Sequence, residues 1–246
     1  MKRLIAALLL TATPALSFDI GAMSDAERAA FGTAVRDYLM ANPEVLIESI
    51  NVLEERRAAS EADSDLALVA ANRDAILDDG HSWVGGNPDG DVTVVEFIDY
   101  RCGYCKRFND QIHEVVDSDG KVRLILKEFP ILGPDSETAA RFAVAVRQVA
   151  GDDAYRAAHH ALMDLRGTPS PEALEEIAQT IGADATAILN TMNTESVSAV
   201  LRDNRQLAER MGIMGTPTFV IGDTLLRGMP ADGLEPAIAR ARDENG

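Results

Sequence analysis

The sequence predicts an α/β domain preceded by a helical arm, and three observations support this prediction. Short apolar runs typical of buried strands occur at residues 92–98, 122–127 and 217–227. Between the second and third runs lies a long segment of helical pattern, from about 135 to 211. A separate helical pattern without strand signals covers residues 18–80. A strand, helix, strand half and a hairpin therefore flank a helical insertion, behind an amino-terminal arm.

Residues 1–17 have the features of a secretory signal peptide. Lys2 and Arg3 precede an apolar core at residues 4–10, and the small residues Ala15 and Ser17 stand at positions −3 and −1 before Phe18. The core is too short for a membrane span, which needs about 20 apolar residues. We therefore expect an exported protein that is periplasmic in a bacterial cell, where disulfides persist.

The composition is strongly acidic. The formal net charge is −17, and loss of Lys2 and Arg3 with the signal peptide makes it −19. Such a charge argues against a nucleic acid partner, since nucleic acid binding depends on cations that contact phosphates. It is compatible with basic or unfolded client proteins.

The arm begins with a strong helix signal. Ser24 to Glu27 fit a capping box, and apolar residues then recur at helical spacing to about Ala41. Asn42 and Pro43 restart the pattern as N-cap and first helical residue. Apolar residues are dense at 45–53, residues 54–65 are polar without a helix breaker, and a mild apolar pattern at 66–77 ends at the turn 78–80.

Such an arm has no core of its own, so its apolar residues must be covered by the domain that follows on the same chain or by copies of the arm. The polar stretch 54–65 has the character of a spacer and favours the second arrangement. We therefore expect a homo-oligomer formed through residues 18–80.

The α/β domain, which contains the candidate catalytic residues described below, is predicted at residues 81–246. A short strand at 83–84 precedes the strand 92–98, and the helix that follows ends near 119–120 before a parallel strand at 122–127. A two-residue Gly-Asp turn joins the strands 217–221 and 224–227 in a hairpin, and a final helix covers 232–241. The helices predicted for the insertion are 136–150, 153–165, 171–181, 184–191 and 195–211.

The only two cysteines, Cys102 and Cys105, lie where the strand 92–98 ends and a helix begins. Unpaired N–H groups of a first helical turn stabilise a thiolate and lower its pKa from about 8.5 to roughly 3.5–7.5. Cys105 lies one turn further on the same helix face, within reach of a disulfide to Cys102. This arrangement predicts a reversible redox pair.

Two alternatives for the cysteines remain open. The pair could be half of a zinc or copper site, with the four histidines at 81, 113, 159 and 160 as the remaining candidate ligands, although histidines more often lie on the surface or pack in a core. The pair could also form an inert disulfide. A bond between such near neighbours closes a small loop and stabilises the fold only slightly.

At the level of motifs the chain resembles a known family. Cys102-Gly103-Tyr104-Cys105 after a strand, a long helical insertion, and the segment 215–219 (Gly-Thr-Pro-Thr-Phe) before a hairpin are similar to the DsbA-type branch of the thioredoxin superfamily. The arm, with Tyr-Leu-Met-Ala-Asn-Pro-Glu-Val-Leu at 38–46, resembles the amino-terminal region of ScsC-like members. The resemblance covers the mature chain and implies a thioredoxin fold with a DsbA-like helical insertion.

The resemblance also implies roles for Pro217, Thr216 and Glu96. Pro217 would be a cis-proline facing the cysteines, an ordinary trans turn being the alternative, and Thr216 would offer backbone groups to a substrate peptide. Glu96, six residues before Cys102, would be a buried acid with a raised pKa that exchanges a proton with Cys105. Strand alternation places Glu96 on the inward face. Lys127 at the end of the neighbouring strand is a candidate partner for Glu96, the alternative being a solvated acid and a solvated lysine.

Gly103 and Tyr104 are expected to contact substrate. Tyr104 replaces the histidine of DsbA itself, which implies a less acidic Cys102 and a less oxidising disulfide. The combination of Gly103 and Tyr104 with Thr216 is that of DsbC-type isomerases. Met211 and Met214 flank the Pro217 loop and suit either a peptide groove or core packing.

Together these features predict a periplasmic thiol:disulfide oxidoreductase that leans toward isomerisation or reduction and needs no cofactor beyond the Cys102–Cys105 disulfide. Its expected partners are unfolded or misoxidised exported proteins, a membrane redox protein that resets the cysteines, and further copies of the chain. The alternative is a copper-binding or holdase protein of metal tolerance that uses the same two thiols.

Overall fold

The computed structural model describes residue 21 and residues 23–245, so the predicted signal peptide lies outside the described residues. Contacts within the chain divide it into two compact units, residues 1–58 and 59–246. The second unit thus begins inside the segment 18–80 that the sequence analysis treats as one arm.

The first unit consists of α1 (Asp25–Ala41) and the first part of α2 (Glu44–Ala71). α1 begins with the predicted capping box, in which the Ser24 side chain accepts from the Glu27 N–H and the Glu27 carboxylate accepts from the Ser24 N–H at 2.8 Å. None of the unit's described residues is buried. The apolar side chains that it leaves largely exposed are Phe31, Val35, Tyr38, Met40, Leu46, Ile47, Ile50, Val52 and Leu53.

The second unit is built on one five-stranded sheet with strand order β1-β3-β2-β4-β5. The strands are β1 (Trp83–Gly86), β2 (Val92–Ile98), β3 (Val122–Glu128), β4 (Thr218–Ile221) and β5 (Thr224–Arg227). β2 and β3 are parallel, as predicted, and the other neighbouring pairs are antiparallel. The central position of β2 explains its near-continuous apolar sequence.

Helices cover both faces of this sheet. α4 (Gly103–Asp119) joins β2 to β3 and shares one core with Val94 and Ile98, to which α10 (Glu235–Asn245) also contributes. The opposite face, with Val95 and Phe97, packs on residues of the end of α2, α3 (Arg73–Leu77) and α9 (Glu195–Arg210). Side chains of β2 therefore face two separate cores.

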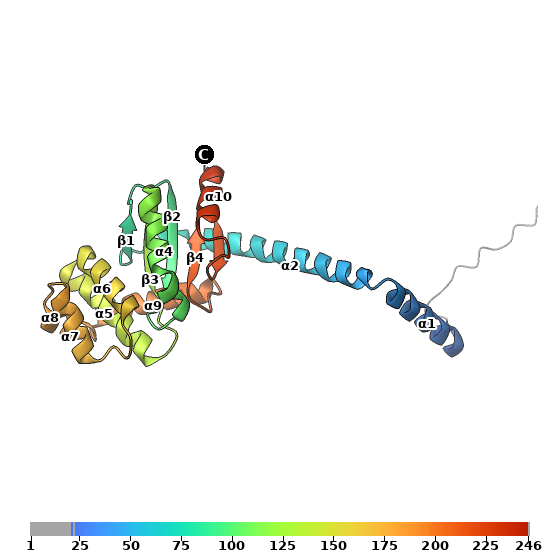
Figure 1. The fold of residues 1–246 in the computed structure, drawn as a ribbon, viewed down its shortest axis with the longest axis horizontal. Coiled ribbons are helices and arrows are strands. Elements are labelled where there is room, and N and C mark those ends of the chain that lie inside the picture. The colour runs from blue at the N-terminus through green and yellow to red at the C-terminus, as the bar shows by residue number, and fades with distance from the viewer. Residues whose placement is uncertain (1–20, 22, 246) are drawn as a thin grey trace, which may run out of the picture. The chain divides into compact units, whose positions relative to one another are not determined.

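The predicted insertion is a run of five helices between β3 and β4. Besides α9, they are α5 (Pro134–Ala150), α6 (Asp152–Asp164), α7 (Pro171–Thr180) and α8 (Ala185–Thr191). α5 to α8 gather in one cluster next to the sheet, drawn in yellow to orange in Figure 1. Within the described part of the chain, no helix combines the length and the apolar character needed to cross a membrane.

Candidate active site

The two cysteines lie at the carboxyl end of β2, where the sequence predicts them. Cys102 is the N-cap of α4, and its Sγ accepts a hydrogen bond from the Cys105 N–H at 3.4 Å. The Cys102 N–H donates to the Asp99 carbonyl at 3.0 Å, which fixes the turn before the helix. Cys102 is only 6% exposed and Cys105 only 1%, whereas Tyr104 between them is 63% exposed. Tyr104 is therefore at the surface, next to a largely enclosed dithiol.

The surroundings of the two thiols lower the pKa of Cys102 and raise the pKa of Cys105. A hydrogen bond from the Cys105 thiol, supported by the Thr216 side chain and by the Tyr104 and Cys105 backbone, lowers the pKa of Cys102 to about 5 against the opposing effect of burial. The pKa of Cys105 is raised far above its ordinary value, because its thiol donates to Cys102 and because it is buried near Glu96. At neutral pH Cys102 is thus mainly a thiolate and Cys105 a thiol.

The loop before β4 closes the site from the other side. The Thr216–Pro217 peptide bond is cis, as the resemblance implies, and the Cys102 Sγ lies 3.1 Å from the Thr216 carbonyl oxygen. This loop lines a groove of about 320 Å³ together with Met214 and Arg227. Met214 is 92% exposed, whereas Met211 is fully buried in the core. Of the two methionines, only Met214 is available to a peptide.

Glu96 lies beneath the cysteines as predicted. It is 4% exposed and occupies the same face of β2 as Val94 and Ile98, which pack in one core with both cysteines. Burial, reinforced by the nearby Cys102, raises the pKa of Glu96 to about 8, and the charge of Glu96 in turn raises the pKa of Cys105. The acid is therefore protonated at neutral pH and electrostatically coupled to both sulfurs.

Asp99 is a site residue that the sequence analysis did not identify. Its Oδ1 accepts from the Arg101 N–H at 2.7 Å, and its Oδ2 accepts from the N–H groups of Ile131 and Leu132 at 2.8 and 3.0 Å. The buried carboxylate thereby holds the loop after β3 against the turn that carries Cys102. Its position directly after a buried strand and before a turn was the available signal.

The comparisons with known proteins agree with this geometry. The profile of the DsbA-like thioredoxin domain matches residues 93–238, more than half of the chain. The chain belongs to the DsbA-like thioredoxin domain family. It is therefore a member of the DsbA-like thiol-disulfide oxidoreductases. A second profile, that of the copper resistance protein ScsC N-terminal domain, matches residues 27–60.

Solved DsbA-like structures resemble the chain over different lengths. A thioredoxin-like oxidoreductase from Silicibacter pomeroyi is 41% identical, with a TM-score of 0.65, and the match covers 70% of this chain and 98% of that one. A ScsC variant from Proteus mirabilis with a linker deletion is 27% identical, with a TM-score of 0.67, and the match covers 92% of this chain and 100% of that one.

Curated relatives match over somewhat more than half of this chain. Disulfide bond formation protein D of Bacillus subtilis is 26% identical over 152 residues, which are 58% of this chain and 68% of that protein. A Na(+)/H(+) antiporter NhaA of Salinispora arenicola is 24% identical over 146 residues. The chain spans only 22% of that antiporter.

Lys127 does not pair with Glu96 in this DsbA-like domain, and that prediction is wrong. The register of the parallel strands sets Leu126 opposite Glu96 and Lys127 opposite Phe97, so Lys127 points to the other face of the sheet. There its buried Nζ forms an ion pair with Asp79 and donates to the Ala75 carbonyl at 2.9 Å. The interpretation of Glu96 and Lys127 as solvated residues is also wrong, because both are buried.

The four histidines do not converge on the cysteines. His113 and His159 are buried in packing between α4 and α6, and their ring centroids lie 5.5 Å apart. Among the described residues, no group of three or more His, Cys, Asp or Glu side chains is arranged to hold a metal ion.

Proposed function

We propose that this chain is an exported, periplasmic thiol:disulfide oxidoreductase that acts on disulfides of exported proteins through Cys102 and Cys105. The observation that carries the proposal is the N-cap position of Cys102, where its pKa falls to about 5. That value lies between about 3.5 for DsbA and about 7 for thioredoxin. A dithiol of intermediate acidity suits an enzyme that leans toward isomerisation or reduction.

In the reducing direction, the Cys102 thiolate attacks one sulfur of a substrate disulfide. The substrate S–S bond breaks, a mixed disulfide forms, and the departing substrate thiolate takes a proton from solvent. Cys105 then loses its proton and attacks the Cys102 sulfur, which releases the second substrate thiolate. The substrate gains two electrons and two protons, and Cys102 and Cys105 become a disulfide.

Glu96 is the proposed proton carrier of the resolving step. The raised pKa of the Cys105 thiol means that it needs a base close by, and the ionised form of Glu96, a minority at neutral pH because its pKa is about 8, would accept that proton. With a pKa near 8, Glu96 exchanges protons readily at neutral pH.

The substrates that this surface suits are unfolded or misoxidised chains with apolar segments next to a cysteine. Tyr104 and Met214 are exposed beside the dithiol, and Leu132, 54% exposed, lies on the loop that Asp99 holds against the same turn. Thr216 would pair with the substrate backbone, with Gly103 and Tyr104 beside it. A membrane redox protein would reset the cysteines after turnover.

The arm is proposed to assemble several copies of the chain. The described residues of its first part, up to residue 58, form no core, and the ScsC N-terminal profile matches residues 27–60. Several domains around a common space would hold a misfolded client while its disulfides exchange, which favours isomerisation.

Reactivation of scrambled ribonuclease by the reduced protein tests this proposal. Wild type should restore ribonuclease activity. Leu46→Arg places a charge among the exposed apolar residues of α2 and should reduce the rate. Glu55→Arg, on the opposite side of the helix by its spacing, is the control and should retain the rate. Equal rates for all three proteins would contradict an assembled isomerase.

A copper-binding protein of metal tolerance is the second candidate function, favoured by the match to the copper resistance protein ScsC N-terminal domain. Thiolates are suitable ligands for Cu(I). Cys105→Ser separates the two functions. An oxidoreductase variant should accumulate mixed disulfides with exported proteins through Cys102, whereas a metal carrier should lose copper without trapping any protein.

A further inference from the structure

A second buried carboxyl group, Glu128 at the end of β3, lies outside the site described above. The side chain is 3% exposed, and its Oε1 accepts hydrogen bonds from the hydroxyls of Tyr100 at 2.8 Å and Tyr155 at 2.6 Å. Burial is the main reason that the pKa of Glu128 is raised to about 8. Glu128 is therefore a neutral acid at neutral pH, and it anchors two tyrosine hydroxyls inside the protein.

The hydrogen bonds of Glu128 lead to the active-site helix by two routes. Tyr100 precedes Cys102 by two residues and is 1% exposed, so its anchored hydroxyl fixes the turn that enters α4. The same hydroxyl lies 3.2 Å from His159 Nδ1, and His159 Nε2 lies 2.7 Å from Asn109 Oδ1 on α4. Because burial keeps His159 neutral, its Nε2–H donates to Asn109, and its unprotonated Nδ1 competes with Glu128 Oε1 for the single hydroxyl proton of Tyr100. The network thus holds α4 at its entrance and again about two turns along.

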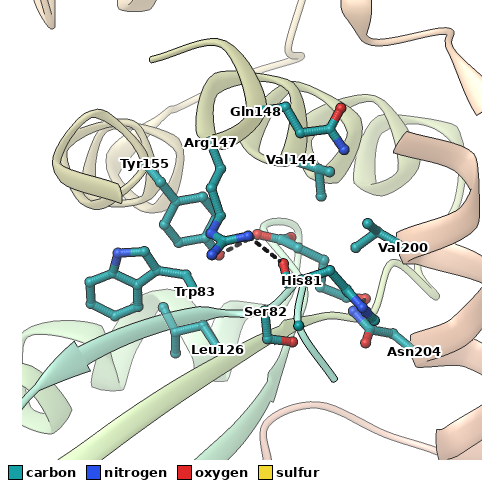
Figure 2. A pocket seen from close by; sticks show the side chains of 12 residues that line it. His81, Ser82, Trp83, Leu126, Val144, Arg147, Gln148, Tyr155, Val200 and Asn204 are labelled. Atoms are coloured by element: carbon teal, nitrogen blue, oxygen red, sulfur yellow. Dashed lines mark hydrogen bonds between the residues drawn. The ribbon is translucent and has the colours of Figure 1, made fainter. Parts of the chain in front are cut away.

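The side chain of Glu128 lies on the wall of a cavity. Oε2 is buried and makes no hydrogen bond to any residue that the structure describes. Glu128 lines a cavity of about 200 Å³ whose rim includes the exposed residues Gly80 and Gln148. Figure 2 shows the rings of Trp83 and Tyr155 side by side on one wall. Since Oε1 accepts from both tyrosines, the carboxyl proton belongs on Oε2.

We propose that Glu128 is a positioning residue for the redox pair, which sets the reactivity of Cys102 by fixing Tyr100 and the first turn of α4. This inference rests on the proposed function, in which Cys102 is the nucleophile. The Cys102 thiolate is stabilised by donors of that helical turn, which include the Cys105 N–H at 3.4 Å. Because such a bond weakens steeply as its geometry worsens, a small rotation of the turn changes the thiolate more than it changes the fold.

Three variants test the role of Glu128. Glu128→Gln keeps the shape and an acceptor oxygen for both tyrosines and places its NH₂ at the position of Oε2. Glu128→Met removes the acceptor and leaves two buried hydroxyls without it. Val144→Ala, a truncation of another buried wall residue of the cavity, is the control for a general loss of packing.

The measurements are the pKa of Cys102, from thiolate absorbance against pH, and the equilibrium constant of the dithiol with glutathione. Glu128→Gln should match wild type within about twofold. Glu128→Met should change the equilibrium constant about tenfold, which is about 30 mV for a two-electron couple. Val144→Ala should lower the melting temperature but leave both redox values unchanged.

The proposal is overturned if Glu128→Met keeps the wild-type pKa and equilibrium constant, or if Val144→Ala shifts them as much as Glu128→Met does. If Glu128→Met does not fold, Tyr100→Phe removes one of the two hydroxyls and is measured in the same way, with the same outcomes. Wild type is titrated first, because an ordinary pKa for its Cys102 would refute the proposed function rather than this role of Glu128.

Discussion

The two units of this chain differ in whether their side chains are buried within the unit itself. In the second unit, two cores surround a sheet, and polar groups such as Glu96, Asp99 and Lys127 are buried with defined surroundings. In the first unit, no described residue is buried and a row of apolar side chains is exposed. The chemistry can therefore be derived from the second unit alone. The role of the first unit depends on the surface that covers its exposed apolar side chains.

The largest expected effect is the loss of activity when either cysteine of the second unit is replaced. Cys102→Ser and Cys105→Ser should both abolish turnover of a small peptide disulfide, because neither variant can complete the exchange. Only Cys105→Ser should accumulate a mixed disulfide, which non-reducing mass spectrometry of the intact protein detects. Turnover by Cys102→Ser would show that the chemistry does not reside at this turn.

Removal of the buried Lys127–Asp79 ion pair tests whether the end of the predicted arm, which contains Asp79, is a structural part of the second unit. Lys127→Met leaves Asp79 without its cation and should lower the free energy of unfolding by about 3–5 kcal/mol. Arg73→Ala is the control, since its ion pair with Asp223 is well exposed and should contribute at most about 1 kcal/mol. Urea unfolding measures both, and equal small losses would contradict the buried pair.

The stability that the Lys127–Asp79 pair contributes should decrease at acidic pH. Although burial opposes it, the Lys127 charge and hydrogen bonds hold the pKa of Asp79 well below its ordinary 3.8. The stability that Asp79 contributes is thus present above pH 3.8 and is lost as the pH falls further. Wild type should lose more stability than Lys127→Met when acidified from pH 5 to pH 2.

Glu96→Gln should affect both catalysis and stability within the second unit. Loss of the proton carrier should slow the resolving step about 100-fold. The pKa of Glu96 is raised from 4.5 to about 8, so the folded state holds a proton that the unfolded state releases between these values. Wild type therefore loses stability as the pH rises from 4.5 to 8, and the variant should lose less, because only Glu128 then keeps a raised pKa of this kind.

Rapid-mixing kinetics and melting curves at pH 5 and pH 8 measure the two effects of Glu96→Gln. A variant with wild-type resolution and an unchanged pH dependence of stability would show that Glu96 is not the buried acid of the reaction.

The smallest effect on chemistry is expected from the arm. Ile50→Arg should change the sedimentation coefficient of the mature protein toward that of a single chain, because it places a charge among exposed apolar side chains. Its turnover of a small peptide disulfide should equal that of wild type. Unchanged sedimentation would remove the proposed role of the arm, and lost turnover would show that the units are not independent.

The sequence predicts most of the second unit because its signals are local. The strand 92–98, the helix that begins at Cys102 and the Gly222-Asp223 hairpin each follow from periodicity or turn residues. The partner of Lys127 was missed because alternation gives the faces of one strand but not the register between two strands. In the sequence, Asp79 is recognisable only as part of the turn at residues 78–80 that ends the helical pattern.

The contacts of Glu128 could not be read from the sequence either. They join residues 27 and 28 positions apart along the chain and depend on how the insertion packs against the sheet. Burial of an acid at the end of a strand has no local signature. Glu96, by contrast, was found through its fixed spacing from Cys102.

The most direct test of the account is the titration of the single reactive thiol in the reduced mature protein, followed by the absorbance of its thiolate. The account predicts an ionisation near pH 5 that disappears in Cys102→Ser. An ionisation near pH 8.5, the value of an ordinary cysteine, would contradict it.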